Sequence, residues 1–250
     1  MAGAPPKYQR ILLKLSGEAL AGGKPHGFDR PAMQAVADAL APVLAAGVQV
    51  GLVVGGGNLF RGLPAAAQGS DRATADYIGM LATVMNALAL HEVLERAGLP
   101  ARVMSALPVT GVAEPFVRVK ALAHLKAGKV VLFGGGIGNP YFTTDTAACL
   151  RAIDIGAQLL LKATKVDGVY DVDPLQHADA SRYEQLDYDE VLARQLGVMD
   201  ATAVALAREH ALPVRVFDMN SRGALLRIVH GESVGTLMAP AAGGKHGRQT

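Results

Sequence analysis

The sequence predicts an α/β fold in which a mainly parallel central sheet is covered on both faces by helices. Short, continuously apolar runs alternate with longer segments of helical spacing along the chain. Continuous apolar runs indicate strands buried on both faces, and their alternation with helices is typical of a parallel sheet. Hydrophobic residues make up 50% of the 250 residues, which is enough for one large core. We therefore expect a single domain over residues 1–250, with its core at about 8–238.

The expected strands and helices follow one another in order. In the first part of the chain we expect strands at 11–16, 48–54 and 101–106, and helices at 31–46, 71–97 and 117–126. In the second part we expect strands at 129–134, 158–163, 213–217 and 235–238, and helices at 144–155, 187–210 and 222–230. A proline near the start of the first helix and a glycine after its end are typical helix boundaries. Residues 240–250 are expected to form a flexible tail.

Charge and cysteine content favour a cytoplasmic protein that needs neither nucleic acid nor membrane. The 24 basic and 22 acidic residues give a net charge of +2, and no basic block is long enough for a nucleic-acid footprint. The single cysteine, Cys149, excludes an intrachain disulfide and favours a reducing compartment. No apolar signal core begins the chain, and the most apolar stretch, around 43–57, is too short for a membrane helix.

Residues able to bind phosphate follow the first expected strand. Ligands of open parallel sheets bind beyond the carboxyl ends of the strands. In the segment LLKLSGEAL, Lys14 interrupts an apolar run, and Ser16 and Gly17 follow it. The lysine can direct its charge into a crevice, and the glycine lets backbone N–H groups approach a phosphate. An edge-strand lysine beside an ordinary turn glycine is the alternative.

A second candidate loop follows the strand expected at 48–54. Three glycines, Gly55 to Gly57, are followed by Asn58 and Arg61. Glycines let a polyanion come close to backbone N–H groups, and an arginine fork binds phosphate oxygens. This combination favours phosphate binding over a merely flexible turn.

A third loop, FGGGIGNPYFTTDTAA (133–148), again places glycines after a strand. Thr143, Thr144 and Asp145 can cap the helix that follows, whose N-terminus attracts anions. Pure capping is the alternative for these three residues. A second glycine-rich loop indicates a second anionic ligand, or the far end of the first.

The fourth loop, LLLKATKVDGVYDVDP (159–174), brings several polar side chains to the end of a strand. It carries Lys162 and Thr164, then Tyr170, which could cover a base, and Asp173, which could accept from a ribose hydroxyl or an amino group. Ordinary turn chemistry is the alternative. No GxxxxGK[ST] phosphate loop, GxGxxG dinucleotide fingerprint or GxSxG nucleophile elbow occurs anywhere in the chain.

Five segments together resemble one known family. They are KLSGEAL (14–20), GGGNLFRG (55–62), MLATVMN (80–86), GNPYFTTDTAACLR (138–151) and LKATKVDGVY (161–170). In combination they resemble the bacterial UMP kinases (uridylate kinases) of the amino-acid kinase superfamily. The resemblance implies a three-layer αβα sandwich, the amino-acid kinase or carbamate kinase-like fold. It implies transfer of the ATP γ-phosphoryl group to UMP with Mg²⁺, in pyrimidine nucleotide (CTP) synthesis. It also implies a homohexamer that GTP activates and UTP inhibits.

The resemblance assigns roles to particular positions. It implies ATP contacts at Lys14, Leu15, Ser16, Gly17, Gly57, Arg61, Thr164, Tyr170 and Asp173. It implies UMP contacts at Gly56, Asp76, Ile137, Gly138, Asn139, Pro140, Tyr141, Phe142, Thr143 and Thr144. It places Lys14, Lys162, Asp145 and Asp200 around the reacting centre. No residue is expected to bind the metal directly, because the ATP phosphates would hold Mg²⁺.

The implied reaction needs no general base. A phosphate monoester has a second pKa of about 6, so the UMP phosphate is largely a dianion at neutral pH. Repulsion between donor and acceptor phosphates is the main obstacle, and Lys14 and Lys162 would offset it. This fits the absence of an obvious nucleophile–base pair in the sequence.

The positions of the family's GTP site are only partly matched. Arg102 matches and Lys129 keeps the charge, but Glu95 stands where a histidine is expected and Arg118 where an aromatic is expected; His91 completes this set.

Two rival functions stay open: an amino-acid or carbamate kinase of the same fold, and a non-catalytic nucleotide-binding regulator. The segment GNPYFTTD (138–145), together with Asp76, favours a nucleotide acceptor and argues against the first function. The presence of both Lys14 and Lys162 argues against the second. The residues alone do not separate UMP from CMP.

Overall fold

The computed structural model describes residues 5–60, 69, 71–172, 174, 176–177 and 179–240. Arg61, Asp173 and the expected tail after residue 240 lie outside these residues. The described strands are β1 (Arg10–Leu15), β2 (Gln49–Val54), β3 (Ala101–Ser105), β4 (Glu114–Pro115), β5 (Val130–Gly134), β6 (Leu159–Thr164), β7 (Gln185–Leu186), β8 (Val214–Asp218) and β9 (Thr236–Met238). They form one nine-stranded sheet in the order β4-β3-β5-β2-β1-β6-β8-β9-β7.

The sheet is mainly parallel, as expected. Every neighbouring pair from β4 to β8 runs parallel. Strand β9 runs antiparallel to β8 and parallel to β7. Strand β1 lies at the centre of the sheet, between β2 and β6. The carboxyl ends of these three strands carry the candidate site.

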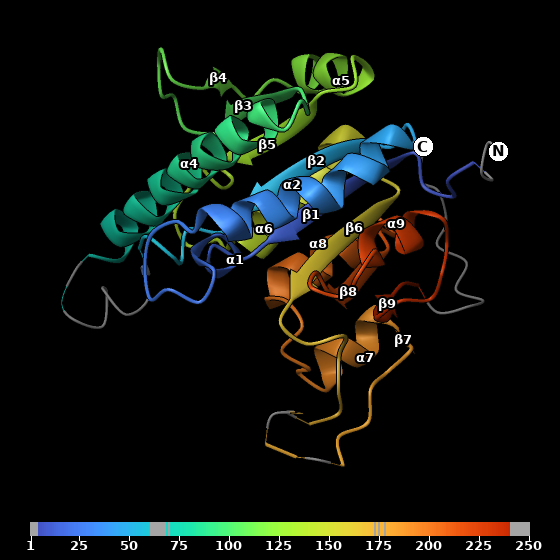
Figure 1. Ribbon diagram of the computed structural model, residues 1–250. Helices are drawn as coiled ribbons and strands as arrows, with labels where there is room; N and C mark the ends of the chain where they lie inside the picture. The colour runs from blue at the N-terminus through green and yellow to red at the C-terminus, as the bar shows by residue number, and fades with distance from the viewer. Residues whose placement is uncertain are drawn as a thin grey trace, which may run out of the picture.

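Helices cover both faces of the sheet (Figure 1). They are α1 (Glu18–Ala21), α2 (Arg30–Ala45), α4 (Arg72–Arg96), α5 (Arg118–Lys126), α6 (Thr144–Ile155), α7 (Tyr188–Ala193), α8 (Ala201–Glu209) and α9 (Ala224–Val229). One buried cluster joins one face of the sheet to α1, α2, α4 and α9. A second cluster joins the other face to α5, α6, α7 and α8. The result is three layers with two cores.

The alternation of side chains along the central strands positions both candidate lysines. In β1, Leu13 and Leu15 face the α2 layer, whereas Leu12 faces the α6 layer. Lys14 follows the same alternation and therefore points toward α6. Lys14 on β1 and Lys162 on β6 are register partners in the parallel ladder. The two ammonium groups consequently meet on one face of the sheet.

One expected helix was wrong in its extent. Instead of a helix over 187–210, the chain forms α7 and α8, with residues 194–200 between them. Gln195 adopts a positive φ of 50°, which ends α7, and Asp200 starts a new helix by accepting a hydrogen bond from the N–H of Ala203. The short elements α1, β4 and β7 were not predicted, because two to four residues show no readable periodicity.

Helix α4 is long and apolar enough to cross a membrane by length and composition alone, with a mean hydropathy of 1.4. Half of that apolar window is buried inside this fold, and core helices of soluble proteins pass the same test. It is a longer apolar segment than the stretch at 43–57. Its buried face packs on β3 and β5.

Candidate active site

An aspartate joins the two lysines at the centre of the sheet. Asp145 Oδ1 lies 2.8 Å from Lys14 Nζ, and Asp145 Oδ2 lies 2.6 Å from Lys162 Nζ. The three side chains are 11–15% exposed. Lys162 also donates to the carbonyl oxygen of Val198. Two ammonium groups and one carboxylate thus form a compact cluster, here called the lysine cluster, at the N-terminus of α6.

Burial and charge compete in setting the ionisation of the lysine cluster. Burial alone would raise the pKa of Asp145, but the charges of Lys14 and Lys162 together hold it below its usual range. Burial lowers the pKa of Lys162, the Asp145 carboxylate opposes this, and the Lys14 charge adds to it. The pKa of Lys162 is lowered overall. The aspartate is therefore ionised at neutral pH and stabilises both ammonium ions.

Asp200 ties α8 to the start of α6. It accepts hydrogen bonds from the hydroxyls of Thr143 and Thr146, and from the N–H of Ala203 over 3.0 Å. Thr143 is itself the cap of α6, because its Oγ1 accepts from the N–H of Asp145 over 3.0 Å. The capping expected for Thr143 is confirmed. Asp200 thus fixes the cap that orients Asp145.

The glycines of the first two loops are needed because the chain packs on itself. A Cβ on Gly17 would lie 2.6 Å from the carbonyl oxygen of Gly55, and closer still to Asn58 Oδ1. A Cβ on Gly56 would lie 2.8 Å from the carbonyl oxygen of Gly79 on α4. Approach of a polyanion is therefore not the only reason for these glycines.

A cavity of about 130 Å³ lies on one side of the lysine cluster. It is lined by Gly56, Phe60, Ala75, Asp76, Gly79, Met80, Thr83, Gly136, Ile137, Phe142, Thr143 and Thr144. Six expected UMP contacts are among these residues: Gly56, Asp76, Ile137, Phe142, Thr143 and Thr144. Four others, Gly138, Asn139, Pro140 and Tyr141, lie in the same loop but do not line the cavity.

Asp76 holds the far end of this cavity together. Its Oδ2 accepts a hydrogen bond from the backbone N–H of Tyr141 over 2.8 Å and pairs with Arg72 Nε at 2.9 Å. Tyr141 has a positive φ of 75° although it is not glycine, and its side chain is 65% exposed. The aspartate therefore stabilises a strained turn of the loop at 133–148.

A larger cavity of about 530 Å³ lies on the other side of the lysine cluster. Lys162, Thr164 and Tyr170, all expected on the ATP side, contribute to its lining. The segment 194–198, which follows α7, forms another part of the lining. The Tyr170 hydroxyl donates to Asp167 Oδ1 over 2.6 Å, which fixes the ring at the mouth. The lysine cluster thus stands between two cavities of different size.

Five of the expected ATP contacts do not line this cavity: Lys14, Leu15, Ser16, Gly17 and Gly57. Leu15 is fully buried in the α2-side core. Ser16 lines a third cavity, of about 640 Å³, between α1, α2 and α9 on the opposite face of the sheet.

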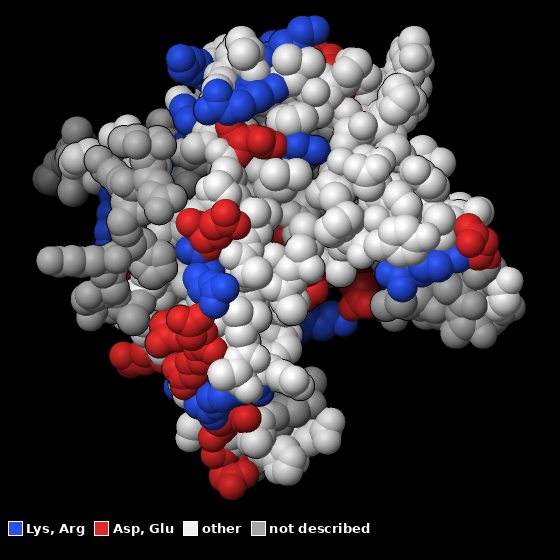
Figure 2. All heavy atoms as spheres, turned by 180° about the vertical axis from the view of Figure 1, so that it is seen from behind, with Lys and Arg blue, Asp and Glu red and all other residues white. Residues whose placement is uncertain are grey.

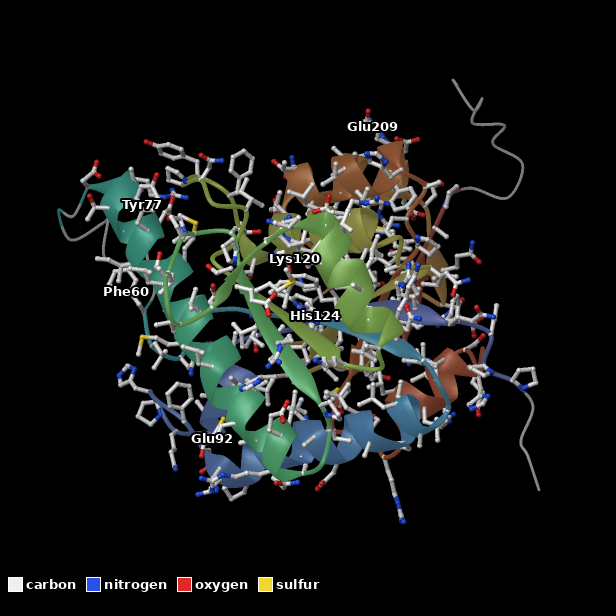
Figure 3. All side chains as sticks on the ribbon, turned by 90° about the horizontal axis from the view of Figure 1, so that it is seen from above. Phe60, Tyr77, Glu92, Lys120, His124 and Glu209 are labelled. Carbon is white, nitrogen blue, oxygen red and sulfur yellow. The ribbon has the colours of Figure 1, made fainter. Side chains whose placement is uncertain are left out.

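The two basic residues expected at a regulatory site lie around β3 and α5. Arg102 Nε is 3.7 Å from Glu114 Oε1, and His124 Nε2 is 3.0 Å from Glu114 Oε2. His124 lies on α5 beside Lys120 (Figure 3). The hydrogen bond from His124, with the nearby cations, lowers the pKa of Glu114. Lys129 is half-buried just before β5. Arg102 thus already has an acidic neighbour.

The other three positions of this expected regulatory site also have partners within the chain. Glu95 Oε1 accepts from the N–H of Ala101 over 2.7 Å and lies 3.8 Å from His91 Nε2. Arg118 Nε donates to the carbonyl oxygen of Asp154 over 2.6 Å. These contacts tie α4 to β3 and α5 to α6.

Three polar residues of the site were missed by the sequence reasoning. Thr83 accepts a hydrogen bond from the N–H of Gly135 over 2.8 Å and so holds the second glycine-rich loop. Thr146 contacts Asp200, as described above. Asn86 donates to the carbonyl oxygen of Gly55 over 2.6 Å. A buried polar residue within the apolar face of α4 was the available signal for Thr83 and Asn86.

Within the described residues, no group of three or more His, Cys, Asp or Glu side chains could hold a metal ion. Asp145 is engaged with two lysines, and Asp200 with two hydroxyls and a backbone N–H. In kinase sites Mg²⁺ is held largely by substrate phosphates and water. The residues present therefore fit an ion delivered on the phosphates of ATP.

Comparison with known proteins agrees with this geometry. The profile of the amino acid kinase family matches residues 9–218. The fold, the paired lysines and this match define the class: the chain belongs to the amino acid kinase family, and the expected three-layer αβα arrangement is confirmed.

Its relatives within that family are uridylate kinases. The chain is 56% identical over 237 residues to the uridylate kinase of Ectopseudomonas mendocina, covering 95% of this chain and 96% of that protein. It is 57% identical over 232 residues to the uridylate kinase of Legionella pneumophila, covering 93% and 94%. The crystal structure of UMP kinase from Bacillus anthracis matches with a TM-score of 0.91 and 41% identity, covering 94% of this chain and 97% of that one.

Proposed function

We propose that this protein is a UMP kinase, which transfers the γ-phosphoryl group of ATP to UMP and forms UDP and ADP in pyrimidine nucleotide synthesis. The observation that supports this most is the lysine cluster between two cavities. The larger cavity has room for adenosine, and the smaller one contains six expected acceptor contacts. The relatives named uridylate kinase point to the same acceptor.

In the proposed mechanism, an oxygen of the UMP phosphate attacks the γ-phosphorus of ATP. A new P–O bond forms, the bond to the β–γ bridging oxygen breaks, and ADP leaves with that electron pair. Lys14 and Lys162 would neutralise charge on the two phosphates, and Asp145 would hold both ammonium groups in place. Mg²⁺ bound to the ATP phosphates would supply further charge neutralisation. No base is required, because the acceptor is already ionised.

An ADP-release assay with ATP and Mg²⁺ tests this proposal. UMP, CMP, aspartate and N-acetylglutamate are offered separately, and turnover is expected with UMP. Turnover with an amino acid instead would contradict the proposed acceptor and support the carboxylate-kinase alternative. Tight ATP binding without any turnover would support the regulator alternative. Comparison of UMP with CMP measures a selectivity that the residues alone leave open.

We further propose GTP as an activator and UTP as an inhibitor. The support is the resemblance to the family, together with the cationic positions Arg102 and Lys129. Because Glu114 and Glu95 lie beside this region, GTP activation is expected to be weak. Titration of each nucleotide into the UMP assay tests both effects. GTP activation that survives Arg102→Ala would place the effector elsewhere.

We also propose a single-domain, cytoplasmic homohexamer whose small-molecule partners are ATP and UMP. On the face shown in Figure 2, basic and acidic side chains are interspersed. Burial, with the charges of Asp145 and Asp200, raises the pKa of Cys149 to about 12, so its thiol is protonated and unreactive. Cell fractionation and light scattering of the purified protein test the location and the subunit number.

A further inference from the structure

Two asparagine side chains form a buried pair beneath the glycine-rich loop at Gly55–Gly57. Asn58 is 1% exposed, and Asn86, on α4, is 0% exposed. Asn86 Nδ2 donates to Asn58 Oδ1 over 2.7 Å, and Asn58 Nδ2 donates back to Asn86 Oδ1 over 3.1 Å. Apolar side chains of similar size would fill this space without the desolvation cost of two amides. The pair therefore requires a reason beyond packing.

A backbone carbonyl fixes the orientation of each amide. Asn86 Nδ2 also donates to the carbonyl oxygen of Gly55 over 2.6 Å. Asn58 Nδ2 also donates to the carbonyl oxygen of Gly27 over 2.9 Å. A carbonyl oxygen only accepts, so each amide must turn its nitrogen toward it, and the remaining N–H then meets the other amide's oxygen. Aspartate could not replace either residue without placing two acceptors in contact.

The pair contacts both loops that would surround the phosphates. Asn58 Oδ1 lies against Gly17, where no Cβ could be accommodated. The nitrogen of Gly57 lies 2.8 Å from that same hypothetical Cβ, so the β1 and β2 loops meet at this point. Through Gly55, Asn86 joins this contact to α4. The two amides thus fix the position of the Gly55–Gly57 backbone relative to α4 and to Gly17.

We propose that Asn58 and Asn86 are positioning residues for phosphoryl transfer. They act through the Gly55 carbonyl and the contact at Gly17, which hold the β1 and β2 loops together beside the proposed phosphate position, and they do not touch substrate themselves. Donors stabilise developing charge most when they are oriented before the substrate arrives. Losing this order should therefore affect kcat and phosphate binding more than nucleoside binding. The inference rests on the proposed role of this loop at the donor and acceptor phosphates.

The test replaces Asn86 with alanine and measures three quantities. We expect kcat to fall on the order of 30-fold, because small misplacement of reacting groups is costly. The KM values for ATP and UMP should change less than about threefold. By calorimetry, the affinity for ADP should fall while the affinity for adenosine stays unchanged, since only ADP carries phosphates.

Matched variants separate positioning from stability. Leu90→Ala removes a buried apolar side chain one turn further along α4 and should lower Tm without changing kcat. Asn58→Ala should reproduce the kcat loss. The double variant should lose about as much kcat as either single variant, because paired groups act as a unit.

Two results would overturn the proposal. One is unchanged kcat in Asn86→Ala with the same loss of Tm as Leu90→Ala. The other is an equal loss of affinity for ADP and adenosine, which would indicate general disorder of the site. If Asn86→Ala does not fold, the milder Asn86→Ser is measured in the same way. An inactive wild-type protein would contradict the proposed function, whereas the comparison of ADP with adenosine would still test the pair.

Discussion

At the scale of single residues, one carboxylate allows two like charges to share a face of the sheet. Lys14 and Lys162 are register partners on neighbouring strands, so their ammonium groups would repel each other if nothing lay between them. Asp145 contacts both, and the cluster retains one net positive charge after two cations and one anion are summed. In the proposed mechanism, that remaining charge attracts the phosphates.

Lys14→Ala tests the charge itself. We expect kcat with UMP to fall by about two orders of magnitude or more, corresponding to roughly 3–4 kcal/mol of transition-state stabilisation. Steady-state kinetics measures it. Lys165→Ala is the matched control, because Lys165 also follows β6 but is 80% exposed and pairs with Glu18 at 2.9 Å. Near-normal turnover in Lys14→Ala would remove this residue from the mechanism.

Asp145→Asn tests the counter-charge through the pH dependence of stability. The pKa of Asp145 in the folded protein lies below its usual range, since the two lysine charges outweigh the opposing effect of burial. Its stabilising contribution is therefore complete above the unfolded-state pKa and is lost as the pH falls through the folded-state pKa. We expect wild type to exceed Asp145→Asn in Tm at neutral pH, and the difference to shrink toward acid pH. A difference that is constant with pH would mean that the charge of Asp145 does not stabilise the fold.

At the scale of elements, local sequence patterns predicted most of the fold but few of the contacts between loops. Continuous apolar runs located the long strands, but the meeting of Lys14 with Lys162 depends on the register between β1 and β6, which no local pattern reports. The meeting of Thr83 with Gly135 depends on chain segments that are 52 residues apart, and no local pattern reports such a contact. The break at 194–200 had local signals that the prediction passed over, namely Gly197 and the capping residue Asp200. Tertiary contacts of Val198 and Asp200 hold it open.

Asp200→Ala tests whether this break serves the site. It removes the cap of α8 and the partner of two threonine hydroxyls, so we expect a loss of about 2 kcal/mol. For a chain of this size that loss corresponds to a decrease in Tm of about 4–8 °C. We also expect lower kcat, because the cap of α6 that orients Asp145 loses its support.

Asp187→Ala provides the matched comparison for Asp200→Ala. Asp187 caps α7 by accepting from the N–H of Glu190 over 2.7 Å. It makes the same kind of cap without the threonine contacts, so we expect a smaller loss of stability and unchanged kcat. Equal effects of the two substitutions on kcat would show that capping alone, and no link to the site, accounts for Asp200.

At the scale of the whole molecule, α4 has a different role on each side. Its inner face holds Asp76, Thr83 and Asn86, which form hydrogen bonds to the glycine-rich loops at 55–57 and 133–148. Its outer face exposes a row of large apolar side chains: Tyr77, Ile78, Leu81 and Met85 are 43–53% exposed. Helix α4 lies at the edge of the molecule, with Tyr77 near one end and Glu92 near the other (Figure 3). Assembly through the outer face would therefore act on the helix that supports the site.

Leu81→Glu tests that connection. The exposed apolar residues recur at three- to four-residue spacing, which forms one stripe on a helix, and such a stripe is typical of a surface that another chain covers. A charge at its centre should yield smaller assemblies by light scattering, because burying an unpaired carboxylate is costly. It should also lower kcat at protein concentrations where the wild type stays assembled. Val119→Glu on α5, where Val119 is 72% exposed, should change neither quantity. Wild-type assembly size in Leu81→Glu would exclude this face as the contact between subunits, and reduced size with full kcat would show that α4 supports the site without help from assembly.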